Sequence, residues 1–349
     1  MDNRDELFGK IWWEDLNGPR RFLVEASNIL SGGKSVVLCL PERVPWLEIM
    51  REVLEKLLRK GTQTIKVLNA EKIFDTPQEY VLKNFCANKR GFRAYNSTAY
   101  AKFLAESTGI ELNDSCLWIR KASPAQAEQW FAFIAEYQNF LAGRKGGVFI
   151  LEAGDDWIAK SDVATLSYTK KISDYDSFAF NIFVAADFAN ENQLMKRYLA
   201  ELVTALTEGD VEFGAACIAK SDDFLKNPDE VFEDLLWEGK FTSGKSTEDI
   251  EQAIWMTQIK LIFPLVETFR RNFVHRYESE IRNFPAHHVP PEEVEIGALY
   301  TQFNTRRWLI SEADANDLEF YREVRNKLAH LRVLPFDELQ KIFEKNLRR

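Results

Sequence analysis

The order of apolar and polar positions predicts an α/β region followed by a helical region. From about Phe22 to Asp187, short apolar runs alternate with stretches of helical spacing, as expected when helices separate strands. The predicted strands cover residues 36–40, 64–68, 116–119, 147–152 and 177–185. Because helices separate these strands, their connections are crossovers, and the sheet is expected to be mainly parallel.

Helical spacing continues from the α/β region into the rest of the chain. Helices are predicted at residues 46–58, 125–141, 191–207 and 229–237. A polar, glycine-containing segment, 241–246, then interrupts the pattern. We place the domain boundary there, which gives an α/β domain over residues 1–240 and a helical domain over residues 246–349.

Four predicted helices fill the C-terminal region. The first begins at Ser246 or Thr247, runs towards Phe284, and is expected to kink at Pro264. The others cover residues 292–303, 311–330 and 336–347, the last following Pro335. Four helices in about a hundred residues predict an all-α four-helix bundle.

Composition limits the classes of protein to which the chain can belong. A length of 349 residues favours two domains, and a net charge of −9 argues against a general nucleic-acid coat protein. The charged N-terminus and the lack of an 18-residue apolar run predict a soluble, cytoplasmic protein without a membrane partner. The four cysteines are far apart and lack metal-ligand spacing, so buried, reduced thiols are expected.

A polar edge of the third C-terminal helix is the strongest candidate for chemistry. It contains the hexapeptide Arg325-Asn326-Lys327-Leu328-Ala329-His330. Asn326 and His330 lie on one helical face, with Arg325 beside that face and Arg322 one turn before Asn326. The predicted buried stripe of this helix is formed by Leu318, Tyr321, Val324, Leu328 and Leu331.

These residue types can cleave RNA without a metal or another cofactor. The imidazole of His330 can take the proton of a ribose 2′-hydroxyl. The guanidinium of Arg325 can hold the phosphate as negative charge develops, and Asn326 can orient the phosphate or His330. Arg322 and Lys327 are the candidate substrate-binding cations. In the structural alternative, Arg325 pairs with a nearby acid and His330 bonds a backbone carbonyl.

The octapeptide Glu323-Val324-Arg325-Asn326-Lys327-Leu328-Ala329-His330 resembles the signature of the HEPN superfamily. Ribonucleases of that family carry Arg, a polar residue, three variable residues and His on a late helix of a four-helix domain. The resemblance covers under a third of the chain and implies that Arg325 and His330 are catalytic and Asn326 supports them. It also implies a homodimer that cleaves RNA to 2′,3′-cyclic phosphate ends. An acid on an earlier helix, frequent in the family, cannot be matched to one residue.

The resemblance extends to the biological setting. Families with this motif are frequent in toxin, phage-defence and stress systems, which implies a regulated ribonuclease and a possible regulatory protein partner. The competing interpretation is a non-catalytic module, in which the helical bundle serves dimerisation or protein interaction.

The α/β region resembles a degenerate P-loop NTPase without its phosphate loop. The segment Ser31-Gly32-Gly33-Lys34-Ser35 precedes a strand, whereas a P-loop follows one, so we expect a helix-ending turn with a left-handed glycine. Glu152, in the fourth predicted strand, occupies a position similar to that of a Walker B acid, although strand-end acids are usually surface or capping residues. This domain is therefore expected to be a sensor or scaffold.

Two other segments have simple structural interpretations. His287 and His288 are adjacent and lack partners at ligand spacing, so a solvated loop is expected. Trp12, Trp13 and the other tryptophans can stack on bases, but packing in the core or in an interface is the default expectation.

Overall fold

The chain divides into two compact units, Met1–Asp176 and Ser177–Arg349, which are described separately. The computed structural model describes residues 3–59, 64–87, 92, 96–158, 163–189, 192–283 and 289–347. The boundary predicted near residues 241–246 falls inside the second unit, directly before its longest helix.

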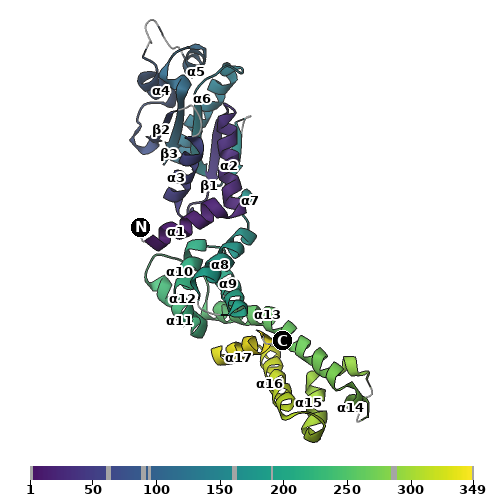
Figure 1. Ribbon diagram of the computed structural model, residues 1–349. Helices are drawn as coiled ribbons and strands as arrows, with labels where there is room; N and C mark the ends of the chain where they lie inside the picture. Colours follow the sequence, from purple (N-terminus) through teal and green to yellow (C-terminus); the bar gives the residue numbers. More distant parts are fainter. Residues whose placement is uncertain are drawn as a thin grey trace. The chain divides into compact units, whose positions relative to one another are not determined.

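A parallel sheet forms the centre of unit 1, as the apolar runs predicted. Within the described residues it has five strands in the order β2-β3-β4-β1-β5, and every adjacent pair is parallel (Figure 1). The strands are β1 (Val36–Leu40), β2 (Thr64–Asn69), β3 (Ser115–Arg120), β4 (Val148–Gly154) and β5 (Ala164–Ser167). Strand β1, which pairs with β4 and β5, is buried along its whole length, which explains its continuous apolar run.

Helices cover both faces of this sheet. Side chains of α4, α5 and α6 form one hydrophobic core with Val37, Leu117 and Phe149, while α2 and α3 pack together on the other face. The helical elements of unit 1 are α1 (Asn3–Lys10), η1 (Ile11–Asp15), α2 (Asn17–Ser31), α3 (Leu47–Leu58), η2 (Ala70–Lys72), α4 (Pro77–Phe85), α5 (Ser97–Glu106), η3 (Glu111–Asp114), α6 (Pro124–Leu141) and α7 (Tyr168–Lys171).

The fifth strand predicted at residues 177–185 is wrong. This segment belongs to helix α8 (Asp174–Phe188), whereas the fifth strand, β5, comes earlier. Its buried residues Ser177, Phe180, Asn181 and Val184 follow helical spacing. Ser173 also donates its backbone N–H and its hydroxyl to Asp176 at the helix start, a capping pattern that the apparent alternation concealed.

All regular elements in the described residues of unit 2 are helices. Besides α8 it contains α9 (Gln193–Thr207), α10 (Val211–Ala219), α11 (Ser221–Lys226), α12 (Pro228–Trp237), α13 (Thr247–Arg276), α14 (Glu278–Asn283), η4 (Pro291–Glu293), α15 (Ile296–Asn304), η5 (Arg307–Leu309), α16 (Glu312–Ala329) and α17 (Phe336–Leu347). The long helix α13 continues through Pro264. Between α13 and α16, Phe269 stacks on Tyr321 with ring centroids 4.3 Å apart.

Several local predictions are confirmed. Gly33 ends α2 in the left-handed region, with a φ of 76°, so the glycine pair forms a helix-ending turn. Trp12 and Trp13 are both buried in unit 1. The four cysteines are buried, and burial raises the pKa of the Cys39 thiol to about 11 and that of Cys116 to about 12.

Candidate functional site

Helix α16 carries the hexapeptide and is fixed at its start by a charged cluster. Ser311 caps the helix, and Asp314 in its first turn accepts hydrogen bonds from Ser311, Arg276 and Tyr277. Burial alone would raise the pKa of Asp314, but hydrogen bonds from Tyr277 and Ser311 and the charge of Arg276 hold it below its ordinary value. The position of α16 therefore depends on contacts with α13 and Tyr277.

The stripe predicted for α16 is buried except at its last member. Leu318, Tyr321, Val324 and Leu328 are buried, and the indole of Trp255 in α13 donates to the carbonyl of Leu328 at 2.8 Å. The prediction for Leu331 is wrong, because this side chain is 71% exposed. It lies beyond the helix end, where the spacing of the helix no longer applies.

His330 is the residue at which the helix stops. Its backbone N–H donates to the carbonyls of Asn326 and Lys327. The next two backbone N–H groups return to Leu328 and Lys327, and Leu331 has a φ of 58°. This is the pattern of a Schellman turn with leucine in the left-handed position. The turn holds the backbone of His330, and the residue itself is exposed.

Arg325 lies towards α15 and makes a weak ion pair. Its Nη2 atom is 3.4 Å from Oε2 of Glu295, the residue that precedes α15. The side chain of Arg325 is 34% exposed and that of Glu295 is 76% exposed. An exposed pair of this length contributes roughly 0–1 kcal/mol. The guanidinium can therefore exchange this acid for a phosphate at little cost.

The two predicted substrate-binding cations lie on opposite sides of α16. The guanidinium of Arg322 stacks over the ring of Tyr300 in α15, 4.0 Å from the ring centroid. The ammonium of Lys327 instead pairs with Glu338 in α17. Arg322 thus shares the α15 side with Arg325, whereas Lys327 is bound to another helix. Asn326 is half-buried between these sides, at the helical position one turn before His330.

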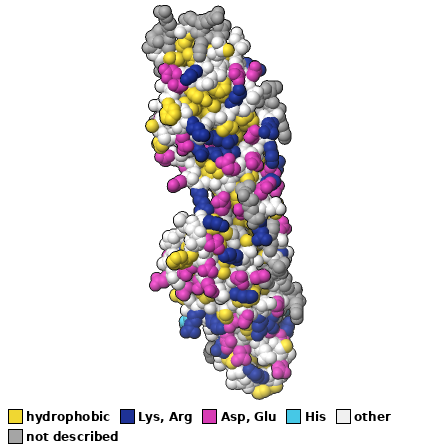
Figure 2. Space-filling view, turned by 90° about the vertical axis from the view of Figure 1, so that its left-hand side faces the viewer, with side chains coloured by type: hydrophobic (Ala, Val, Ile, Leu, Met, Phe, Trp, Pro, Cys, Tyr) yellow, Lys and Arg dark blue, Asp and Glu magenta, His cyan; other side chains and the backbone are white. Residues whose placement is uncertain are grey.

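Charges of both signs surround this edge. In Figure 2, Lys and Arg side chains are interspersed with Asp and Glu over the visible face of the helical unit. Along the α15 side, Arg307 lies 3.5 Å from Glu319, which also accepts from the hydroxyl of Tyr300. The site therefore offers individual guanidinium groups held by exposed acids, and not a continuous basic surface.

A groove of about 700 Å³ begins directly after the hexapeptide. Its walls come from α12, α13 and residues 331–336, and they include the exposed apolar side chains of Leu331 and Val333. The amide of Gln258 in α13 both donates to and accepts from the backbone of Leu334, which fixes this segment. The sequence pattern gave no sign of this groove, because its walls come from distant segments.

Glu152, the possible Walker B equivalent, is buried and paired. It accepts from Nε and Nη2 of Arg51 in α3 and from the indole of Trp118 in β3. Burial alone would lower the pKa of Arg51, but Glu152 holds it above its ordinary value. For neighbouring Arg120, burial and the charge of Arg51 lower the pKa. Glu152 is thus a buried partner of Arg51, and the expected surface or capping role is wrong.

The described residues contain neither a metal-binding cluster nor a membrane-spanning helix. No cluster of three or more His, Cys, Asp or Glu side chains among them could hold a metal ion. None of the helices in this part of the chain is long and apolar enough to cross a membrane. The adjacent histidines His287 and His288 lie outside the described residues.

Comparisons with known proteins identify no family for the chain. No protein-family model matches the sequence, and no curated protein matches it. Among solved structures, the chain is similar to Cdc6p from Pyrobaculum aerophilum, at 12% identity and a TM-score of 0.33, over 95% of this chain and 94% of that chain. This similarity is too low to support a shared fold or function.

Proposed function

We propose that the protein is a metal-independent endoribonuclease of HEPN type, with Arg325, Asn326 and His330 as its catalytic residues. The observation that carries the proposal is the end of α16, where an exposed His330 follows a half-buried Asn326 and a weakly paired Arg325. The residues required for RNA cleavage thus lie at a solvent-accessible helix end. The structural alternative expects Arg325 to pair with an acid, which it does with Glu295, but this pair is long and its acid is 76% exposed.

The chemistry is a transesterification within the RNA. The imidazole of His330 takes the proton of the 2′-hydroxyl, and the 2′-oxygen forms a bond to the adjacent phosphorus. The bond from phosphorus to the 5′-oxygen breaks, and that oxygen leaves with a proton from the imidazolium or from water. Arg325 stabilises the added negative charge on the phosphate. The products are a 2′,3′-cyclic phosphate and a 5′-hydroxyl end.

A homodimer is part of the proposal, because two copies of the hexapeptide are expected to share one cleft. Helix α13 supports it with an apolar strip at helical spacing: Met256 is exposed, and Ile259 and Phe263 are half-buried. A second copy is the occupant that would bury this strip. Unit 1, with its parallel sheet, would be a degenerate NTPase that restrains the ribonuclease in a toxin, stress or phage-defence system.

The test is RNA cleavage by the full chain in the presence of EDTA. Labelled single-stranded RNA should be cut to 2′,3′-cyclic phosphate ends, and His330→Ala should reduce the rate by at least about 100-fold. His275→Ala is the matched control, because His275 is an exposed histidine of α13 outside the hexapeptide. Equal cleavage by the His330→Ala variant and the parent chain would contradict the assignment.

A second candidate function is a non-catalytic protein-interaction or dimerisation module. The groove beside α13, with the exposed side chains of Leu331 and Val333 in its wall, favours this alternative. If the folded, dimeric chain leaves RNA intact even when the restraint by unit 1 is relieved, the ribonuclease proposal fails. The interaction module is then the remaining interpretation.

A further inference from the structure

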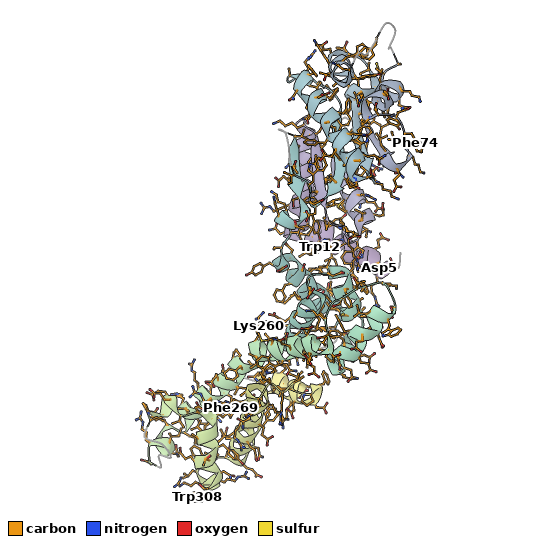
Figure 3. The ribbon with its side chains drawn as sticks, turned by 180° about the vertical axis from the view of Figure 1, so that it is seen from behind. Asp5, Trp12, Phe74, Lys260, Phe269 and Trp308 are labelled. Carbon is orange, nitrogen blue, oxygen red and sulfur yellow. The ribbon has the colours of Figure 1, made fainter. Side chains whose placement is uncertain are left out.

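Trp308 is an exposed aromatic residue between two helices of unit 2. It lies in η5, between α15 and α16, and is 78% exposed. Figure 3 labels it at one tip of the helical unit, whereas the labelled Phe269 lies inside that unit. Arg306 and Arg307 precede it directly. Other large aromatic side chains of this unit, such as Tyr321 and Phe303, are buried, so an exposed tryptophan next to two arginines needs a separate explanation.

Contacts between α15 and α16 connect Trp308 to the hexapeptide. Next to Trp308, Arg307 pairs with Glu319 of α16. Glu319 accepts from Tyr300, and the ring of Tyr300 lies under the guanidinium of Arg322. One turn further, Arg325 meets Glu295. Three guanidinium groups therefore lie along the α15 side of α16, from Trp308 towards the helix end at His330.

The ion pairs on this path are weak enough to be exchanged. The pairs Arg307–Glu319 and Arg325–Glu295 are 3.5 Å and 3.4 Å long, and both acids are more than a third exposed. Such pairs contribute roughly 0–1 kcal/mol. A phosphate group, which accepts charge-assisted hydrogen bonds from arginine, can replace either acid.

The length of the path corresponds to a few nucleotides. Eleven residues separate Glu319 from His330, and at 1.5 Å per residue this is roughly 16 Å. A stacked strand rises about 3.4 Å per nucleotide. The contact between Arg307 and Glu319 therefore lies about five stacked nucleotides from the helix end at His330, and fewer if the strand is extended.

We infer that Trp308 is a base-stacking platform for single-stranded RNA, with Arg307, Arg322 and Arg325 binding the backbone between the stacked base and the cleaved bond. This inference rests on the proposed function and names its substrate class. Duplex RNA does not fit the site, because its bases are already stacked on one another and are not free to meet a side chain.

The experiment is a binding titration of the full chain carrying His330→Ala, which keeps the RNA intact. Its ligand is a short fluorescein-labelled single-stranded RNA followed by anisotropy. Adding Trp308→Ala should weaken binding on the order of 10-fold, and Trp308→Phe should restore most of it. Trp237→Ala is the matched control, because Trp237 is 89% exposed on α12, outside the path. It should leave the Kd unchanged.

An RNA series with one abasic nucleotide locates the contact. One abasic position should weaken binding to the chain with Trp308 and have no further effect on the Trp308→Ala variant. Equal Kd values with and without Trp308, or no RNA binding by the chain that contains it, would overturn the inference. If the Trp308→Ala variant loses self-association but keeps its affinity for RNA, the inference is also overturned, since Trp308 would then be a protein contact. If RNA binding depends on Trp308 but the parent chain does not cleave RNA, only the ribonuclease proposal is refuted, and the inference about Trp308 stands.

Discussion

Two arginine–glutamate pairs in this molecule contain the same chemical groups and have opposite properties. In unit 1, Arg51 and Glu152 are 7% and 8% exposed, and the carboxylate accepts two hydrogen bonds from the guanidinium. In unit 2, Arg325 and Glu295 meet through one long contact near solvent. The first pair cannot release its arginine without leaving a buried charge. The second can, because water or another anion replaces the acid.

The difference shows why the type of residue does not identify a site. The strand position of Glu152 is similar to that of a catalytic acid, but its carboxylate is bonded to Arg51 and Trp118. Arg325 was assigned to catalysis on spacing and resemblance, and its environment leaves the guanidinium available. Burial and the number of bonded partners show whether a charged side chain supports the fold or is available for chemistry.

The largest effect is expected from breaking the buried pair. Glu152→Ala leaves the buried Arg51 with only the exposed Glu48 as an ionic partner, so unit 1 should lose about 3–5 kcal/mol of its free energy of unfolding. Urea unfolding followed by tryptophan fluorescence measures this loss. A double replacement, Arg51→Met with Glu152→Leu, should recover most of it. An unfolding midpoint of Glu152→Ala equal to that of the parent chain would mean that the pair does not support the sheet.

The open pair should show the reverse pattern. Arg325→Ala should lower the rate of RNA cleavage by about 100-fold or more while changing the free energy of unfolding by less than about 1 kcal/mol. Glu295→Gln breaks the same ion pair but keeps the guanidinium, so it should retain the cleavage rate within a few-fold. If both variants lose activity equally, the ion pair and not the free guanidinium is required.

The pair between Arg276 and Asp314 is intermediate, with side chains 58% and 14% exposed. The pKa of Asp314 is lowered from 3.8 in the folded chain, so its stabilisation is present above that pH and disappears as the pH falls through the folded value. Asp314→Asn should cost about 1 kcal/mol at neutral pH and nothing once the carboxyl is protonated. Thermal unfolding across acidic pH tests this, and a cost independent of pH would contradict it.

Much of the fold could be predicted because local patterns agree with tertiary burial. The apolar run of β1 and the helical spacing of α6 and α17 gave the correct element types. The pattern failed at residues 177–185, where apolar residues occupy so many positions that alternation and helical spacing both fit. There the capping contact between Ser173 and Asp176 was the more reliable signal.

The candidate site was only partly accessible from the sequence. Spacing placed Arg325, Asn326 and His330 on one region of a helix, which the structure preserves. It could not show that Lys327 faces α17 while Arg322 and Arg325 face α15, because those directions depend on neighbouring helices. Glu295 was missed for the same reason, and the sequence could not distinguish Trp308 from the other tryptophans that can stack on bases. Neither residue belongs to a motif, and the role of each depends on residues that the fold brings near it.

The leucine that follows His330 affects how stable unit 2 can be. A left-handed backbone costs a residue with a Cβ atom roughly 1–2 kcal/mol, a cost that glycine does not pay. Leu331 adopts that backbone and still exposes most of its side chain, so little hydrophobic burial offsets the strain. Glycine at position 331 would therefore make the folded chain more stable. Selection of the isolated protein for stability alone would replace Leu331, and with it remove the apolar side chain that lies between the hexapeptide and the groove.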